Sequence, residues 1–133
     1  MEIAFFMAME RLPTATGQER GVNRKTDAYY EHAGAKQTRA KLRGHLAPNR
    51  PEQPLRGPVR LVVKWCFPET KEHPAGTWKT TRPDTDNLQK ILKDEMTKLG
   101  FWKDDAQVCS ETVEKFWWDV PGIYVSAEEI KTE

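Results

Sequence analysis

The sequence predicts an α+β fold, a single two-layer domain in which two α-helices pack on a mixed sheet of about five strands. Three observations support this prediction. Segments rich in branched and aromatic residues occur near both ends of the chain and in its middle. A helix-period apolar stripe lies between two pairs of aspartates. With 133 residues, of which 38% are hydrophobic, the chain is expected to form one domain over residues 1–133 and to bury roughly two thirds of its unfolded-chain surface.

The first twelve residues, MEIAFFMAMERL, predict a strand. Ile3, Phe5 and Met7 alternate with their neighbours and would share one face of a sheet. The segment has no basic leader and no small-residue cleavage site, and it is too short to cross a bilayer. We therefore expect a cytoplasmic protein that does not bind a membrane.

Residues 13–26 are turn-rich and predict a polar loop. Residues 27–46 then predict an amphipathic basic helix, in which Gly34 weakens the middle. Residues 1–60 contain 11 Lys/Arg and 6 Asp/Glu, a charge of +5, whereas residues 61–133 contain 10 and 14, a charge of −4. This asymmetry is small, and an ordinary solvated surface explains it as well as an anionic partner does.

The following elements are mainly strands. A connector with four prolines leads to residues 59–67, VRLVVKWCF, which predict a strong strand. Residues 68–81 predict a long loop that returns as a short strand from Trp78. Residues 108–118 predict another strand, and residues 121–130 predict a last short one with an acidic tail.

The centre of the chain predicts a helix over residues 87–99. Pro83 restrains the backbone before it, so the chain arrives there in an extended conformation. Asp86 as N-cap and Gln89 three positions on would form a capping box, and Gly100 suits the left-handed residue that closes a helix. The predicted inward stripe has one charged member and comprises Leu88, Ile91, Leu92, Glu95, Met96 and Leu99.

Aspartates stand on both sides of this helix. Asp84 and Asp86 are two residues apart in an extended segment, so their carboxylates point to the same face and repel unless a cation lies between them. Oxygen ligands of this kind suit hard cations such as magnesium, manganese or calcium. Asp104 and Asp105 follow the helix, which could bring both acidic ends to one place. The plainer alternative is that Asp86 only caps the helix and that the later pair forms a polar turn.

Other known sites fit this pattern less well. An EF-hand loop counted from Asp84 would have Leu88 at its fifth position and Gln89 in place of the glycine. A nucleotide-sugar D-x-D site would need a nucleotide-binding sheet, for which the chain is short. Cys66, Cys109 and the three histidines have no zinc-binding spacing, and we expect both thiols to be reduced.

The motif R-P-D-T-D-N-L-Q-K, a helix ending in L-G-F-W, and K-D-D-A-Q-V together closely resemble the RusA-type Holliday junction resolvases, small endodeoxyribonucleases of bacteria and prophages. The resemblance covers about residues 82–108. It implies that Lys90 acts near the scissile phosphate, and it leaves the part of Asp104 open. The metal-binding catalytic carboxylates that it implies are Asp84, Asp86 and Asp105.

The resemblance implies a magnesium-dependent endonuclease in which Mn²⁺ can replace Mg²⁺. Such an enzyme resolves Holliday junctions and related branched DNA by paired cleavage in recombination, repair or phage DNA processing. A homodimer would present two active sites to one junction. The residues expected to contact DNA lie in the polar loop, in the basic helix and just before the acids, and they are Arg20, Arg24, Lys25, Arg39, Arg43, Lys79 and Arg82.

The residues of the implied site are consistent with cleavage of a phosphodiester. Lys90 follows Asp86 by four residues and lies one turn along the same helix face, where its ammonium could stabilise extra negative charge on phosphorus. Two other classes of protein stay open. One is a junction-binding or DNA-binding protein that does not cut, and the other is a small structural domain with no nucleic-acid partner.

Overall fold

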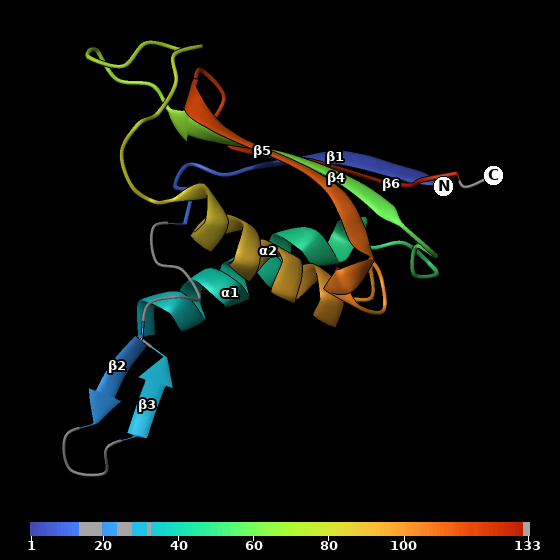
Figure 1. Ribbon diagram of the computed structural model, residues 1–133. Helices are drawn as coiled ribbons and strands as arrows, with labels where there is room; N and C mark the ends of the chain where they lie inside the picture. Colours follow the sequence, from blue (N-terminus) through green and yellow to red (C-terminus); the bar gives the residue numbers. More distant parts are fainter. Residues whose placement is uncertain (14–19, 24–27, 32, 132–133) are drawn as a thin grey trace.

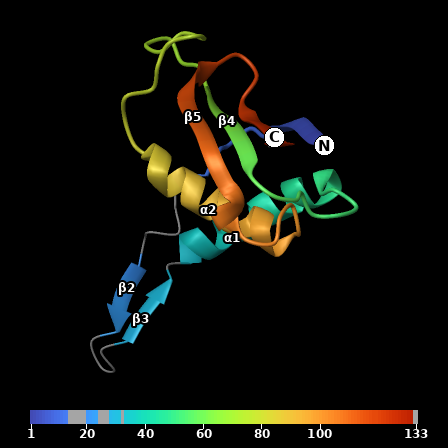
Figure 2. The same ribbon diagram turned by 45° about the vertical axis from the view of Figure 1, so that its right-hand side comes forward.

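The computed structural model describes residues 1–13, 20–23, 28–31 and 33–131 (Figure 1). Helices α1 and α2 lie on the same face of one sheet, as Figures 1 and 2 both show, and this arrangement confirms the predicted α+β class. The elements in chain order are β1 (Glu2–Ala8), β2 (Arg20–Asn23), β3 (Ala28–Glu31), α1 (Ala33–Leu46), the 3₁₀ turn η1 (Ala47–Asn49), β4 (Val59–Pro68), α2 (Thr85–Lys98), the 3₁₀ turn η2 (Asp105–Gln107), β5 (Val108–Trp118) and β6 (Gly122–Glu129).

The main sheet is mixed, and within the described residues it has four strands in the order β1-β6-β4-β5, where about five were predicted. β6 is antiparallel to both β1 and β4, whereas β5 is parallel to β4. Parallel neighbours need a long crossover connection, and α2 lies within the one that joins β4 to β5. The edge strand β5 therefore runs beside the helix that carries the central motif.

Residues 27–46 do not form the single helix that the sequence predicts. Ala28–Glu31 is strand β3, paired antiparallel with β2, and α1 begins only at Ala33. Tyr29 and Tyr30 have a high strand propensity, which wins over the helical pattern at this end. The β2–β3 sheet extends away from the main sheet, beyond α1 (Figure 1).

Helix α2 starts two residues earlier than predicted. Its N-cap is Asp84, whose side chain makes no capping hydrogen bond within the described part of the chain. The predicted capping box at Asp86 is wrong, because Asp86 already lies in the first helical turn. At the other end Gly100 has φ of 83°, the left-handed conformation that was expected there.

The hydrophobic core sets the rotation of α2 about its axis. The inward side chains of α2 are fully buried and belong to the core cluster, and they are Leu88, Ile91, Leu92 and Met96. Burial of each such side chain stabilises the fold by about 1.5–3 kcal/mol. Apart from the buried Gln89 and Glu95, the polar side chains of α2 therefore face outward or towards the sheet edge. The core side chains that the sheet contributes from β4 and β6 include Val59, Leu61, Val63, Trp65, Ile123, Val125 and Ala127.

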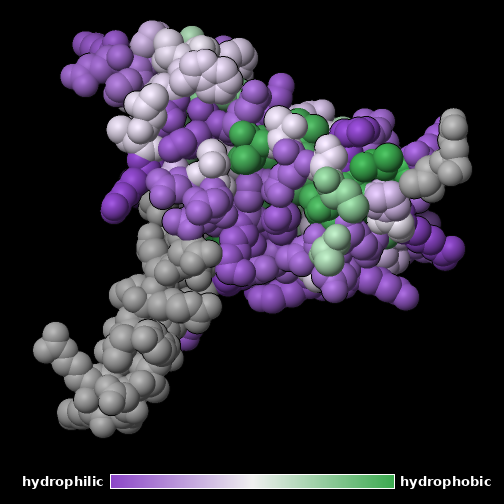
Figure 3. All heavy atoms as spheres, viewed as in Figure 1, coloured by the Kyte–Doolittle hydropathy of each residue, from purple (hydrophilic) through white to green (hydrophobic). Residues whose placement is uncertain are grey.

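The remaining features concern the loop before α2 and the polarity of the surface. Trp78 forms an isolated bridge with Phe116 in place of the predicted short strand, and its side chain is exposed. Figure 3 shows that the surface over the two helices is mostly hydrophilic in this view. Neither helix in the described ranges has the length and apolar content that crossing a bilayer requires.

Candidate active site

An open hollow of about 490 Å³ lies between α2 and β5. Helix α2 turns one polar face towards it, because Asp86, Gln89, Lys90 and Lys93 recur at steps of three and four residues. The turn before β5 contributes Asp105. The full lining is Thr85, Asp86, Gln89, Lys90, Lys93, Asp105, Glu111 and Val113.

Three of the four predicted catalytic residues line this hollow, namely Asp86, Lys90 and Asp105. Asp84 is not among the lining residues and stands exposed at the N-cap of α2. Across the ranges that the structure describes, no three His, Cys, Asp or Glu side chains lie close enough together to hold a metal ion by themselves. The fold therefore gathers acids and a lysine around one space without closing a complete ligand set.

The two aspartates after α2 have different surroundings. The side chain of Asp104 accepts a hydrogen bond of 2.9 Å from the backbone N–H of Ala106, and the side chain of Gln107 completes a capping box around η2. Asp104 is thus engaged in holding the turn. Asp105, the first residue of η2, lines the hollow.

A buried amide fixes the wall of the hollow. Gln89 is 4% exposed, and its Oε1 accepts a hydrogen bond of 3.0 Å from Trp65 Nε1. Its Nε2 donates to Glu111 Oε2 at 2.7 Å, and Lys93 Nζ donates to Glu111 Oε1 at 3.0 Å. Helical spacing from Asp86 could have pointed to Gln89 and Lys93. Glu111 gave no such signal, because a strand pairing places it there.

The segment that leads into the acids is tied to β5. Lys115 Nζ donates to the carbonyl oxygen of Pro83 at 2.8 Å and also to that of Thr81. Lys79 Nζ donates to Thr81 Oγ1 at 2.6 Å and lies 4.4 Å from the centroid of the Trp117 ring. Burial, and secondarily the charge of Lys115, lowers the pKa of Lys79. Two lysines thus hold the chain just before Asp84.

The two arginines expected from the basic helix face α2. Arg39 reaches Asp94 Oδ2 at 3.4 Å and Glu95 Oε2 at 3.2 Å, and Arg43 reaches Glu95 Oε1 at 2.8 Å. Glu95 is fully buried, and Lys98 also pairs with it at 3.0 Å. Arg39 and Arg43 therefore have a structural part in joining the helices, and their contact with DNA stays a prediction.

The other expected DNA contacts are spread over the chain. Arg82 is exposed on the segment before the acids, close in sequence to Lys79. Arg20 begins strand β2. Arg24 and Lys25 lie outside the described residues, so these contacts too stay predictions.

Carboxylates and ammonium groups around one open hollow are suited to phosphodiester cleavage, which needs sites for a cation and for negative charge on phosphorus. The comparison with protein families agrees with this class. The family model described as Endodeoxyribonuclease RusA matches residues 11–128. The chain belongs to the RusA endodeoxyribonuclease family, as its central motif predicted.

Two of three individual relatives are named as crossover junction endodeoxyribonucleases. The chain is 31% identical over 112 residues to the crossover junction endodeoxyribonuclease rusA of Lactococcus phage r1t, covering 81% of this chain and 83% of that protein. It is 31% identical over 130 residues to the uncharacterized protein YqaN of Bacillus subtilis, covering 89% and 91%. A shorter match of 58 residues is 59% identical to the crossover junction endodeoxyribonuclease RusA of Escherichia coli K12, covering 44% of this chain and 40% of that one.

Proposed function

We propose that this protein resolves Holliday junctions and related branched DNA by paired, metal-dependent cleavage of phosphodiester bonds. The observation that carries the proposal is the meeting of Asp86, Asp105 and Lys90 at one open hollow. Membership of the RusA endodeoxyribonuclease family supports the same activity, as does the phage relative named as a crossover junction endodeoxyribonuclease. We place the activity in recombination, repair or phage DNA processing.

The donor set around the hollow fits magnesium, with manganese as a substitute. Asp86 and Asp105 offer carboxylate oxygens. The carboxylate of Asp84 makes no capping hydrogen bond within the described chain, so it too can act as a ligand. Magnesium in enzymes that act on phosphates is commonly held by one or two carboxylates, with water and substrate phosphate as further ligands. An incomplete set of protein ligands is therefore compatible with a cation that arrives with DNA. We propose Asp84, Asp86 and Asp105 as its ligands.

The bound cation would lower the pKa of water and supply positive charge at the phosphate. Lys90 extends from α2 into the same hollow, where its ammonium can stabilise negative charge that develops on phosphorus. Lys93 pairs closely with Glu111, at 3.0 Å, whereas the pair of Lys90 with Asp94 is longer, at 3.9 Å, and leaves the Lys90 ammonium freer to meet a phosphate. We therefore assign the role at the scissile phosphate to Lys90, and the role of holding the groove wall to Lys93, Glu111 and Gln89.

Resolution of a four-way junction needs two cuts, so we propose a homodimer with one site in each protomer. We further propose that residues 1–133 form one domain, of which the matched range 11–128 is the greater part. The cytoplasmic location expected from the sequence remains a prediction.

The test is cleavage of a labelled four-way junction with magnesium, with chelator, and with the variant Asp86→Asn. We expect symmetric nicks that need the metal and that disappear in the variant. Asp119→Asn, which removes an exposed carboxylate in the turn between β5 and β6, is the matched control and should cut normally. Nicks that survive Asp86→Asn would overturn the site assignment.

The alternative is a junction-binding protein that does not cut. The lack of a closed set of three metal ligands within the described ranges is the observation that favours it. Tight junction binding with no nicks in magnesium or manganese would establish this alternative. No junction binding even at low salt would exclude both functions, because electrostatic attraction to phosphates is strongest there.

A further inference from the structure

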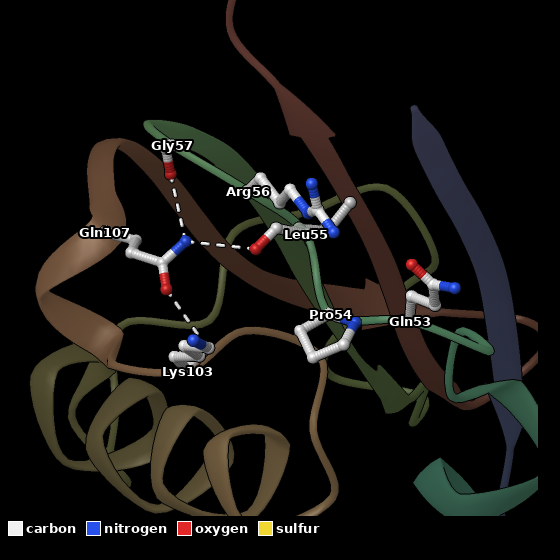
Figure 4. A pocket seen from close by; sticks show the side chains of 7 residues that line it. All are labelled: Gln53, Pro54, Leu55, Arg56, Gly57, Lys103 and Gln107. Atoms are coloured by element: carbon white, nitrogen blue, oxygen red, sulfur yellow. Dashed lines mark hydrogen bonds between the residues drawn. The ribbon is translucent and has the colours of Figure 1, made fainter.

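A second hollow, of about 390 Å³, lies between the connector before β4 and the turn around η2 (Figure 4). Gln107 joins its two sides: its Nε2 donates to the carbonyl oxygens of Leu55 and Gly57 at 3.1 and 3.0 Å. Its Oε1 accepts from the backbone N–H of Lys103 at 3.0 Å. Leu55 is 1% exposed and anchors the connector in the core. The hollow is thus a built feature, held by hydrogen bonds and a buried side chain.

The charge of this hollow is positive. Its lining contains two cationic side chains, Arg56 and Lys103, and no acid. Both residues are exposed, and neither forms an ion pair with any described acidic residue. Arg60 and Lys93 differ in this respect, because Glu128 and Glu111 pair with them. Two unbalanced cations on a fixed wall are suited to an anion that arrives from outside.

The position of the hollow relates it to the candidate active site. Lys103 lines the second hollow, and Asp105, two residues later, lines the first. The capping box of Asp104 and Gln107 holds the short turn between them. An extended strand of DNA whose phosphate lies at Asp105 would therefore have a neighbouring part of its backbone close to Lys103.

We propose that Arg56 and Lys103 form a binding site for a backbone phosphate of the DNA next to the one that is cleaved. The proposal rests on the proposed function and adds a contact outside the catalytic groove. Contacts of this kind fix the register of DNA on the protein without reading its sequence. The two side chains should therefore contribute to affinity and to its salt dependence, and not to the chemical step.

The test compares the double variant Arg56→Gln, Lys103→Gln with the wild type. Junction binding is measured by fluorescence anisotropy in chelator, so that the DNA stays intact, between about 50 and 200 mM salt. Cleavage in magnesium is measured at saturating junction. Arg60→Gln is the control for loss of an arginine charge elsewhere, since Arg60 is exposed, pairs with Glu128 and lines neither hollow. Thermal melting checks that all variants fold.

We expect the double variant to bind roughly tenfold more weakly at 0.1 M salt, with a slope of log K against log salt that is smaller by about one to two. Its cleavage rate at saturation should stay within about twofold of wild type. An unchanged slope in a folded double variant would overturn the proposal while leaving the nuclease assignment intact. Absence of junction binding by the wild type would instead overturn the proposed function itself.

Discussion

Lys115 Nζ donates a hydrogen bond of 2.8 Å to the carbonyl oxygen of Pro83, the residue immediately before Asp84. Lys115 lies on β5, and Pro83 lies on the loop that enters α2, so this bond joins the sheet edge to the start of α2. The same ammonium also binds the carbonyl oxygen of Thr81. The acids at the start of α2 thus depend for their position on a lysine from another element.

We predict that Lys115→Met lowers the cleavage rate at saturating junction by roughly 10- to 100-fold, because small misplacements of catalytic groups are costly. The KM for the junction should change little. Lys115→Arg, which can still donate to both carbonyls, should recover part of the rate. Rate and KM measured on all three proteins would test this. A rise in KM with an unchanged rate at saturating junction would show instead that Lys115 acts on DNA directly.

A second prediction concerns Lys90. Lys90→Met should lower cleavage by roughly 10²- to 10³-fold, since the variant loses the positive charge that we propose acts at the reacting phosphate. Its pair with Asp94 is long, at 3.9 Å, and half exposed, so the melting temperature should hardly change. Single-turnover cleavage and junction binding are the measurements. Lys131→Met, beyond β6, is a control that should cut at the wild-type rate.

The buried carboxylate of Glu95 predicts a pH effect on stability. Burial alone would raise its pKa, but hydrogen bonds from Lys98 and Arg43, the charge of Lys98 and a hydrogen bond from Arg39 together outweigh burial and lower it. A group with a lowered folded pKa stabilises the protein above its unfolded pKa, about 4.3 for Glu, and this contribution is lost as the pH falls through the folded value. The free energy of unfolding, measured with urea at a series of pH values from pH 7 down to acid pH, should therefore decrease.

The variant Glu95→Gln isolates this contribution. It should destabilise the protein at pH 7 by about 3 kcal/mol, at the low end for breaking a buried ion pair because Arg43 and Lys98 stay about half exposed. The difference from wild type should shrink as the pH falls. A difference that stays constant down to acid pH would mean that packing, and not charge, explains the effect.

The cysteines should differ in reactivity. Burial raises the pKa of the Cys66 thiol to about 11, although Lys64 opposes the shift, and Cys109 is exposed. At pH 8 a thiol reagent should therefore modify Cys109 quickly and Cys66 only after unfolding. Counting modified thiols by mass spectrometry, with and without denaturant, would test this. Rapid modification of two thiols in the folded protein would contradict the burial of Cys66.

Local sequence determined the central helix and its surroundings. The apolar stripe from Leu88 to Met96 predicts the helix, because a helix repeats every 3.6 residues whatever it packs against. The glycine at position 100 predicts where it ends, and the aspartates on both sides are visible in the sequence itself. The same stretch carried the motif whose resemblance predicted the family, which the match over residues 11–128 then showed. Where two local signals competed, as at Tyr29 and Tyr30, periodicity predicted a helix and pairing with β2 decided for a strand.

Only the tertiary structure decided what surrounds the acids. The parallel pairing of β4 with β5 puts Glu111 and Lys115 beside α2, more than twenty residues from their partners Gln89 and Pro83. The N-cap of α2 falls at Asp84, whose carboxylate makes no capping hydrogen bond within the described residues, while the Asp104 side chain caps η2. These contacts depend on which strands become neighbours, and that choice follows from burial of the whole core, which no short stretch of sequence contains.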